Sequence, residues 1–142
     1  MRKETAEQRI VAKKAAESAI KLMMTNVQRK VLVEESRRGL IVVYACYGCL
    51  DEDNKEVAGQ ETTEGEERVI DVTIPLQYLV EDSQLHLHES SSKSHLLGFF
   101  DPCPGEEKKL YIKYLFKDKL HEVTISDTEA IGLPLACMFI LY

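Results

Sequence analysis

Residues 40–47 read Leu-Ile-Val-Val-Tyr-Ala-Cys-Tyr, an unbroken apolar run rich in β-branched and aromatic side chains. Such a run is typical of a strand in the middle of a sheet, where both faces are covered. It follows directly on Gly39, and glycine is the residue that most often stands just beyond the last turn of a helix. The sequence therefore predicts a change from helix to buried central strand at residues 39–40.

Upstream of this point, residues 5–38 contain neither proline nor glycine and predict one long helix. Its apolar residues recur every three or four positions and form one stripe: Ala16, Ile20, Met23, Met24, Val27 and Val31. At 1.5 Å per residue the helix would be about 50 Å long, whereas a body of about 100 residues has a radius of gyration of only about 13 Å. We expect the C-terminal half to pack on the body. The N-terminal half is expected to be exposed, to pair with another chain as a coiled coil, or to continue upstream in a longer protein.

Downstream of residue 47 the pattern changes to strands. Residues 68–74 alternate in character until Pro75, and Leu85 and Leu87 alternate with polar neighbours. Residues 110–116 and 120–126 flank the short polar tip Lys117-Asp118-Lys119, which indicates a hairpin. The sequence thus predicts an α+β fold in which a long N-terminal amphipathic helix is followed by a mostly antiparallel β-sheet.

Three regions are expected along the chain. Residues 1–39 form the long basic helix, residues 40–132 form a β-rich domain, and residues 133–142 form an apolar tail. The β-rich domain contains an acidic loop at 51–67, which holds eight acidic residues and one lysine. No apolar run approaches the 18 residues or so that a membrane-spanning helix needs, so no transmembrane segment is predicted.

Charge is distributed unevenly along the chain. Residues 1–39 carry a formal charge of +5, and residues 40–142 carry −11, which gives the net −6. Phosphate backbones are bound by basic patches, so the acidic body argues against a nucleic-acid-binding domain. The basic segment is interpreted as a solvated helix, with contact to anionic lipid as the alternative.

Two of the four cysteines form a C-x-x-C sequence, Cys46-Tyr47-Gly48-Cys49. A redox motif of this type places its first cysteine at a helix N-terminus, whereas here the pair ends a predicted strand. A zinc site would need further ligands, for which Cys103 is one candidate. The favoured interpretation is a pair of small, partly buried side chains, with no metal, no cofactor and no catalytic residues in the chain.

The segment Gly98-Phe99-Phe100-Asp101-Pro102 is the most distinctive loop. Successive side chains of an extended backbone point in opposite directions, so one of the two phenylalanines is a candidate exposed contact. The alternative is that both rings pack under the loop. Asp101-Pro102 predicts a turn closed by the aspartate side chain. Together with Ile20 and Val27 of the helix, the four residues Phe99, Phe100, Asp101 and Pro102 are the candidate partner-binding residues.

Several long segments occur together in a recognisable order. They are Glu34–Arg37 with Gly39–Val43, then Val69–Gln77, then Gly98–Cys103 with Gly105–Lys108. This order resembles the C-terminal domain of the J-domain protein family called DnaJ homolog subfamily C member 11.

The resemblance implies a domain without assigned chemistry in a protein associated with the mitochondrial outer membrane. It implies protein partners in cristae-organising and outer-membrane assembly complexes. Contact with Hsp70 would come only through a J domain, whose His-Pro-Asp signature is absent from these residues. The expected role is a non-catalytic interaction domain that docks the full-length protein. The alternatives are a client- or peptide-binding module and a zinc or thiol-redox protein that uses the C-x-x-C cysteines.

Overall fold

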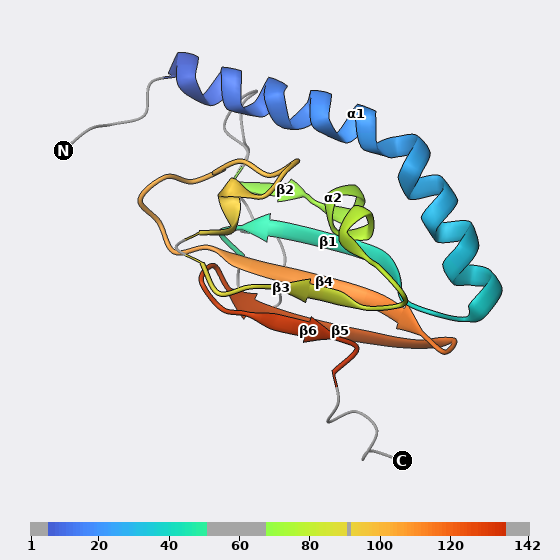
Figure 1. The fold of residues 1–142 in the computed structure, drawn as a ribbon. Helices are drawn as coiled ribbons and strands as arrows, with labels where there is room; N and C mark the ends of the chain where they lie inside the picture. Colours follow the sequence, from blue (N-terminus) through green and yellow to red (C-terminus); the bar gives the residue numbers. More distant parts are fainter. Residues whose placement is uncertain (1–5, 51–67, 91, 136–142) are drawn as a thin grey trace.

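A computed structural model describes residues 6–50, 68–90 and 92–135, and it confirms the α+β fold with a long N-terminal helix (Figure 1). The predicted acidic loop 51–67 and residues 136–142 of the apolar tail lie outside the described residues. The helices are α1 (Ala6–Arg37), α2 (Thr73–Leu79) and a 3-10 turn, η1 (Lys93–His95). The strands are β1 (Ile41–Gly48), β2 (Val69–Asp71), β3 (Leu85–Leu87), β4 (Lys109–Phe116), β5 (Lys119–Ser126) and β6 (Ile131–Leu133).

The main sheet has four antiparallel strands in the order β2-β1-β4-β5, and β3 pairs with β6 in a second, two-stranded sheet. The central position predicted for residues 40–47 is confirmed. Its complete burial is wrong at one place, because the register shifts between Val42 and Tyr44 in the pairing with β4. This irregularity leaves Val43 and Tyr44 exposed, while Ala45 and Tyr47 enter the core.

The predicted hairpin is confirmed as β4 and β5, which pair from Lys109 with Ser126 to Phe116 with Lys119. Lys117 and Asp118 form its two-residue tip, and both have positive φ, 53° and 64°. Two positive φ values match the right-handed twist of the strands, which is why such tips connect hairpins even here, without glycine. Arg38, just beyond the end of α1, holds the tip in place, because its Nε donates a hydrogen bond to the Asp118 carboxylate at 2.5 Å.

The predicted strand at residues 68–74 ends early, at Asp71, and Pro75 lies inside helix α2. Proline is accepted in the first turn of a helix because the N–H groups there have no helical partner. Helix α2 also supplies side-chain acceptors for backbone N–H groups of β1 that a longer β2 would have paired. Gln77 Oε1 accepts from the Val42 N–H at 2.6 Å, and Thr73 Oγ1 accepts from the Ala45 N–H at 2.9 Å.

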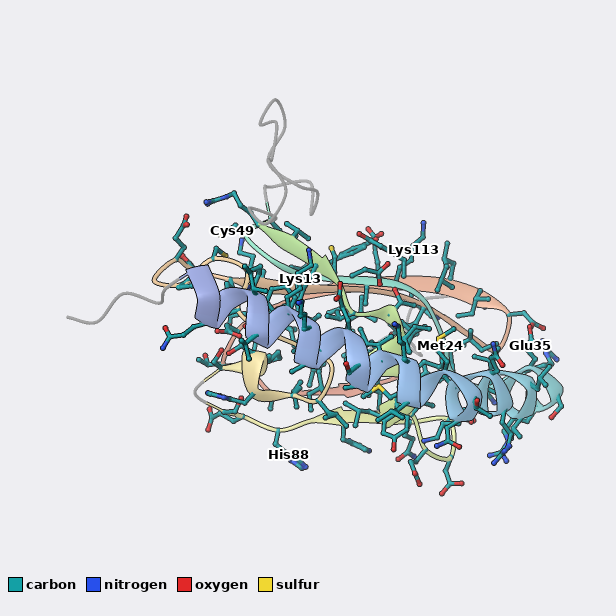
Figure 2. The ribbon with its side chains drawn as sticks, turned by 90° about the horizontal axis from the view of Figure 1, so that it is seen from above. Lys13, Met24, Glu35, Cys49, His88 and Lys113 are labelled. Atoms are coloured by element: carbon teal, nitrogen blue, oxygen red, sulfur yellow. The ribbon has the colours of Figure 1, made fainter. Side chains whose placement is uncertain are left out.

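Helix α1 curves along the sheet with α2 beneath it, as Figures 1 and 2 show from two directions. Ala16, Met23 and Val27 of the predicted stripe are buried, whereas Met24 is exposed. The expectation that the N-terminal half stands clear of the body is wrong, since Ala16 belongs to the core and Ala12 packs against it. Alanine has only a methyl group, so this half of the helix approaches the body closely. Within the described parts of the chain, no helix has the length and apolar character needed to cross a membrane.

Candidate interaction surface

A groove runs between the N-terminal half of α1 and the segment 94–101. It encloses about 410 Å³ and is lined by Ala12, Ala15, Ala16, Ala19 and residues 94–101. Figure 1 shows this segment beneath the first turns of α1. The sequence predicts contact surfaces on the N-terminal half of the helix and on the 98–102 loop. The fold places these two segments side by side.

A smaller hollow of about 260 Å³ lies beyond Ala16. Its lining includes Lys13, Glu17, Ile20 and residues 69–71, and it shares Ala16, Gly98 and Phe100 with the groove. Ile20, a candidate binding residue, is thus half-buried at this hollow, whereas Val27 is buried in the packing of α1 and presents no free surface.

Gly98 permits the close approach of the loop to the body. Its φ is +87°, and a Cβ at this position would lie 2.6 Å from Cγ of Pro75. A side chain here would be both strained and in collision, so the floor of the groove depends on glycine.

The two aromatic side chains of the loop are both buried. Phe99 is 6% exposed and Phe100 is 8% exposed, and the Phe99 ring lies 5.3 Å from that of Tyr47. The idea that one ring projects as a contact is therefore wrong, and the alternative of two rings packed under the loop is the observed one. The chain is not extended here, because the Phe99 N–H donates to the Leu96 carbonyl and closes a turn. The alternation of side chains expected of an extended backbone therefore does not apply to Phe99 and Phe100.

The predicted turn at Asp101-Pro102 is confirmed. Oδ1 of Asp101 accepts from the Cys103 N–H at 3.0 Å and lies 3.4 Å from Nζ of Lys108. Pro102 is buried. Of the four loop candidates, only Asp101 is not buried, although Phe99 and Phe100 also contribute to the lining of the groove.

Two exposed apolar residues, one in the groove and one beside it, were not singled out by the sequence. Leu97 lines the groove and is 63% exposed, and Val11 is exposed one turn before Ala15 on the same helical face. Leu22 continues this face two turns beyond Ala15 and is also exposed. The signal was present in the spacing of Val11, Ala15 and Leu22, but it is hidden by the stronger buried stripe.

A buried polar network anchors the loop from below. Nζ of the fully buried Lys93 donates to the carbonyls of Ser126, Asp127 and Glu129 at 2.6–3.2 Å. The Asp127 carboxylate accepts from the Tyr47 hydroxyl at 2.5 Å and from the Ser92 hydroxyl at 2.9 Å. Sequence reasoning missed this network, because a lysine between serines has no pattern that predicts burial.

The network shifts the acidity of its members. Burial raises the pKa of Tyr47, and its hydrogen bond to Asp127 raises it further. Burial also lowers the pKa of Lys93. Burial by itself raises the pKa of Asp127, but hydrogen bonds from Tyr47, the Lys93 N–H and Ser92 outweigh that effect, so the pKa lies below its usual value. All three groups are engaged with one another or with backbone.

The structure pairs Cys49 with Cys103. Their Sγ atoms lie 2.7 Å apart, and both side chains are buried as free thiols. Cys46 lies in β1, in register with Asp71 of β2 and Tyr111 of β4. Within residues 6–50, 68–90 and 92–135, no group of three or more His, Cys, Asp or Glu side chains is arranged to hold a metal ion.

Comparison with known proteins finds relatives that are named as DnaJ homologs or as J domain-containing proteins. The chain is 46% identical over 132 residues to a DnaJ homolog subfamily C member 11 homolog of Dictyostelium discoideum, which covers 92% of this chain and 22% of that protein. It is 46% identical over 133 residues to DnaJ homolog subfamily C member 11 of Mus musculus, covering 94% of this chain and 22% of the relative. An uncharacterized J domain-containing protein of Schizosaccharomyces pombe is 33% identical over 127 residues, with 86% and 18% covered.

The chain thus spans about a fifth of the length of these relatives. No solved structure matches it. Residues 1–134 match the family described as DnaJ-like protein C11, C-terminal. This match covers the helix, both sheets and the groove, and we conclude that the chain belongs to the DnaJ-like protein C11 C-terminal family.

Proposed function

We propose that this chain is a non-catalytic protein-docking domain of a J-domain protein at the mitochondrial outer membrane. In this role it attaches the full-length protein to cristae-organising and outer-membrane assembly complexes. Membership of the DnaJ-like protein C11 C-terminal family supports the assignment to a J-domain protein. The mitochondrial site and the partner complexes are expectations from the resemblance.

The groove beside α1 is the observation that carries the docking role. Its helical wall consists of alanines, the exposed Leu97 lines it from the loop side, and the exposed Val11 lies one turn before Ala15 on the same helical face. Small wall residues let a partner backbone approach closely, and exposed apolar residues beside a groove are the usual anchors for an amphipathic helix. We therefore propose a helical segment of a partner protein, with an apolar face, as the occupant.

We propose no catalytic role for Lys93 and Asp127, two buried ionisable groups under the groove. Lys93 donates to three backbone carbonyls, and Asp127 accepts from two hydroxyls and one backbone N–H. A general acid or base must instead face a substrate within hydrogen-bond reach. These groups stabilise the loop under the groove and are not directed at a ligand.

The test is recovery of partners from gently solubilised mitochondria with tagged residues 1–142 as bait. Removing α1 is a poor comparison, because Ala16, Met23 and Val27 belong to the buried interior. Point variants at the groove are sharper. Leu97→Gln and Val11→Gln place a polar amide at exposed positions, so the fold is expected to survive while the groove loses its apolar rim.

Leu32→Gln is the matched control. Leu32 is 67% exposed, close to the 63% of Leu97, and it lies in the C-terminal half of α1, outside the lining of the groove. Recovery of cristae-organising or outer-membrane assembly subunits, reduced about tenfold by the groove variants and unchanged by Leu32→Gln, would support docking. Equal recovery with all three variants would remove the groove from the proposal. Binding of many unrelated unfolded peptides would favour a client-binding module instead.

A further inference from the structure

We propose that Cys49 and Cys103 form a reversible redox pair, in which a small-molecule disulfide of the glutathione type converts the two thiols into an intramolecular disulfide. This inference is independent of the docking role. It also differs from a C-x-x-C redox site, because the partner of Cys49 is Cys103 and not Cys46.

Geometry brings the two thiols together from distant parts of the chain. Cys49 follows β1 directly, and Cys103 stands in the loop between η1 and β4. Their sulfurs lie 2.7 Å apart, and a disulfide bond is about 2.05 Å long, so closure needs a movement of less than about 1 Å. A mixed disulfide formed on one of two thiols held this close is attacked by the other thiol far faster than by an external thiol.

The backbone segments that carry the two cysteines also approach each other closely. Gly48 has a φ of +144°, and a Cβ there would lie 3.0 Å from Cγ of Pro102, the residue before Cys103. The Cys49 N–H donates to the Arg68 carbonyl at 3.0 Å, and the thiol of Cys103 lies 3.9 Å from the same carbonyl oxygen. Both cysteines therefore contact the same backbone carbonyl, that of Arg68, just before β2.

The two thiols differ in their exposure to solvent, which sets the order of the reaction. Burial raises the pKa of Cys103 to about 12, and the neighbouring Cys49 adds to the effect. Cys103 is also the less exposed of the two, at 3% against 8%. Cys49 is therefore the thiol that meets the oxidant first.

In the first step the Cys49 thiolate attacks one sulfur of oxidised glutathione. The glutathione S–S bond breaks, a mixed disulfide forms on Cys49, and one glutathione thiolate leaves and takes up a proton. In the second step the Cys103 sulfur attacks the Cys49 sulfur, the mixed disulfide bond breaks, and the second glutathione leaves as a thiolate that takes up the proton lost by Cys103. The protein loses two hydrogen atoms and gains one S–S bond, while one oxidised glutathione is reduced to two thiols.

The experiment uses the fully reduced chain of residues 1–142, incubated with oxidised glutathione and then blocked with a thiol reagent. Titratable thiols are expected to fall from the four cysteines of the sequence to two. Trypsin cuts after Arg38, Lys55, Lys93 and Lys108, so the new bond would join peptide 39–55 to peptide 94–108. Oxidation is also expected to raise the melting temperature by about 5 °C or more, because the disulfide closes a long loop.

Peptide 39–55 contains both Cys46 and Cys49, so the bridging sulfur is identified by fragmentation of the linked peptides. Cys46→Ser provides a matched control that should keep the link, and Cys49→Ser should abolish it. Fragmentation of the wild-type protein gives the answer even where a variant fails to fold. A Cys46–Cys49 bond, a persistent glutathione adduct, or four thiols that remain free would each overturn the proposal.

Discussion

Lys93 and Asp127 are joined twice, each through its side chain to the backbone of the other. Nζ of Lys93 donates to the carbonyl of Asp127 at 3.1 Å, and the N–H of Lys93 donates to Oδ1 of Asp127 at 2.8 Å. This double link fixes the 3-10 turn before the groove to the end of β5. The loop that lines the groove therefore starts from a rigid, buried point.

Replacement of Lys93 by methionine should lower the free energy of unfolding by about 3 kcal/mol. Methionine fills a similar volume but leaves the carbonyls of Ser126, Asp127 and Glu129 without their donor in a buried place. Urea unfolding followed by circular dichroism measures the loss. Lys109→Met, at an exposed position of β4, is the control and should change stability by less than about 0.5 kcal/mol. A loss no larger than that of the control would mean that the buried ammonium does not stabilise the loop.

Asp127→Asn should remove a pH-dependent part of the stability. The pKa of Asp127 is lowered overall, because hydrogen bonds to the carboxylate outweigh the effect of burial. The folded state then binds fewer protons than the unfolded state near the ordinary pKa of 3.8. The contribution is therefore complete above that pH and is lost as the pH falls through the folded-state pKa. We expect a difference between wild type and variant of about 1–2 kcal/mol at pH 7, shrinking below about pH 4.

Urea unfolding at pH 7 and at acidic pH measures that difference. Asp82→Asn is the control, because Asp82 is exposed at the end of a 3.9 Å contact with Arg37, and asparagine tolerates its φ of 50°. A pH-independent difference for Asp127→Asn would contradict the assigned role of the charge.

Gly98→Ala should destabilise the chain more than Gly105→Ala. The two glycines have nearly equal φ, +87° and +81°, so the conformational strain of about 1 kcal/mol is shared. Only at Gly98 does the added methyl group collide, with Pro75, whereas nothing lies within 4 Å at Gly105. The additional loss at Gly98 should be about 1–3 kcal/mol. Thermal unfolding of both variants measures it, and equal losses would show that the loop yields without resistance.

Glu34→Leu should cost about 2–3 kcal/mol of stability. The buried Glu34 carboxylate accepts from the Leu40 N–H at 2.9 Å and from the Ser83 hydroxyl at 2.6 Å, which joins the end of α1 to β1 and to the turn before β3. Leucine leaves the buried N–H unpaired. Glu35→Leu, one residue later on the exposed face, is the control and should change stability by less than about 0.5 kcal/mol. Guanidinium unfolding of both variants distinguishes a bonded carboxylate from a general effect of charge removal.

Features that depend on neighbouring residues were predictable from the sequence. The helix that ends just before Gly39, the short strand at Leu85 and Leu87, and the hairpin of β4 and β5 follow from periodicity and turn residues. The turn closed by Asp101 was predictable for the same reason, since its hydrogen bond spans only two residues. In each case the residues that determine the local conformation are close together in the chain.

The tertiary structure decided the features in which distant groups meet. Helix α2 replaces a longer strand because Gln77 and Thr73 satisfy the backbone of β1. Both phenylalanines of the loop belong to the core, with the Phe99 ring beside that of Tyr47. Cys49 lies against Cys103, 54 residues away, although Cys46 is its near neighbour in sequence. Local periodicity reports which face of an element is apolar, but the partner of each buried group depends on long-range packing, which no short window of sequence contains.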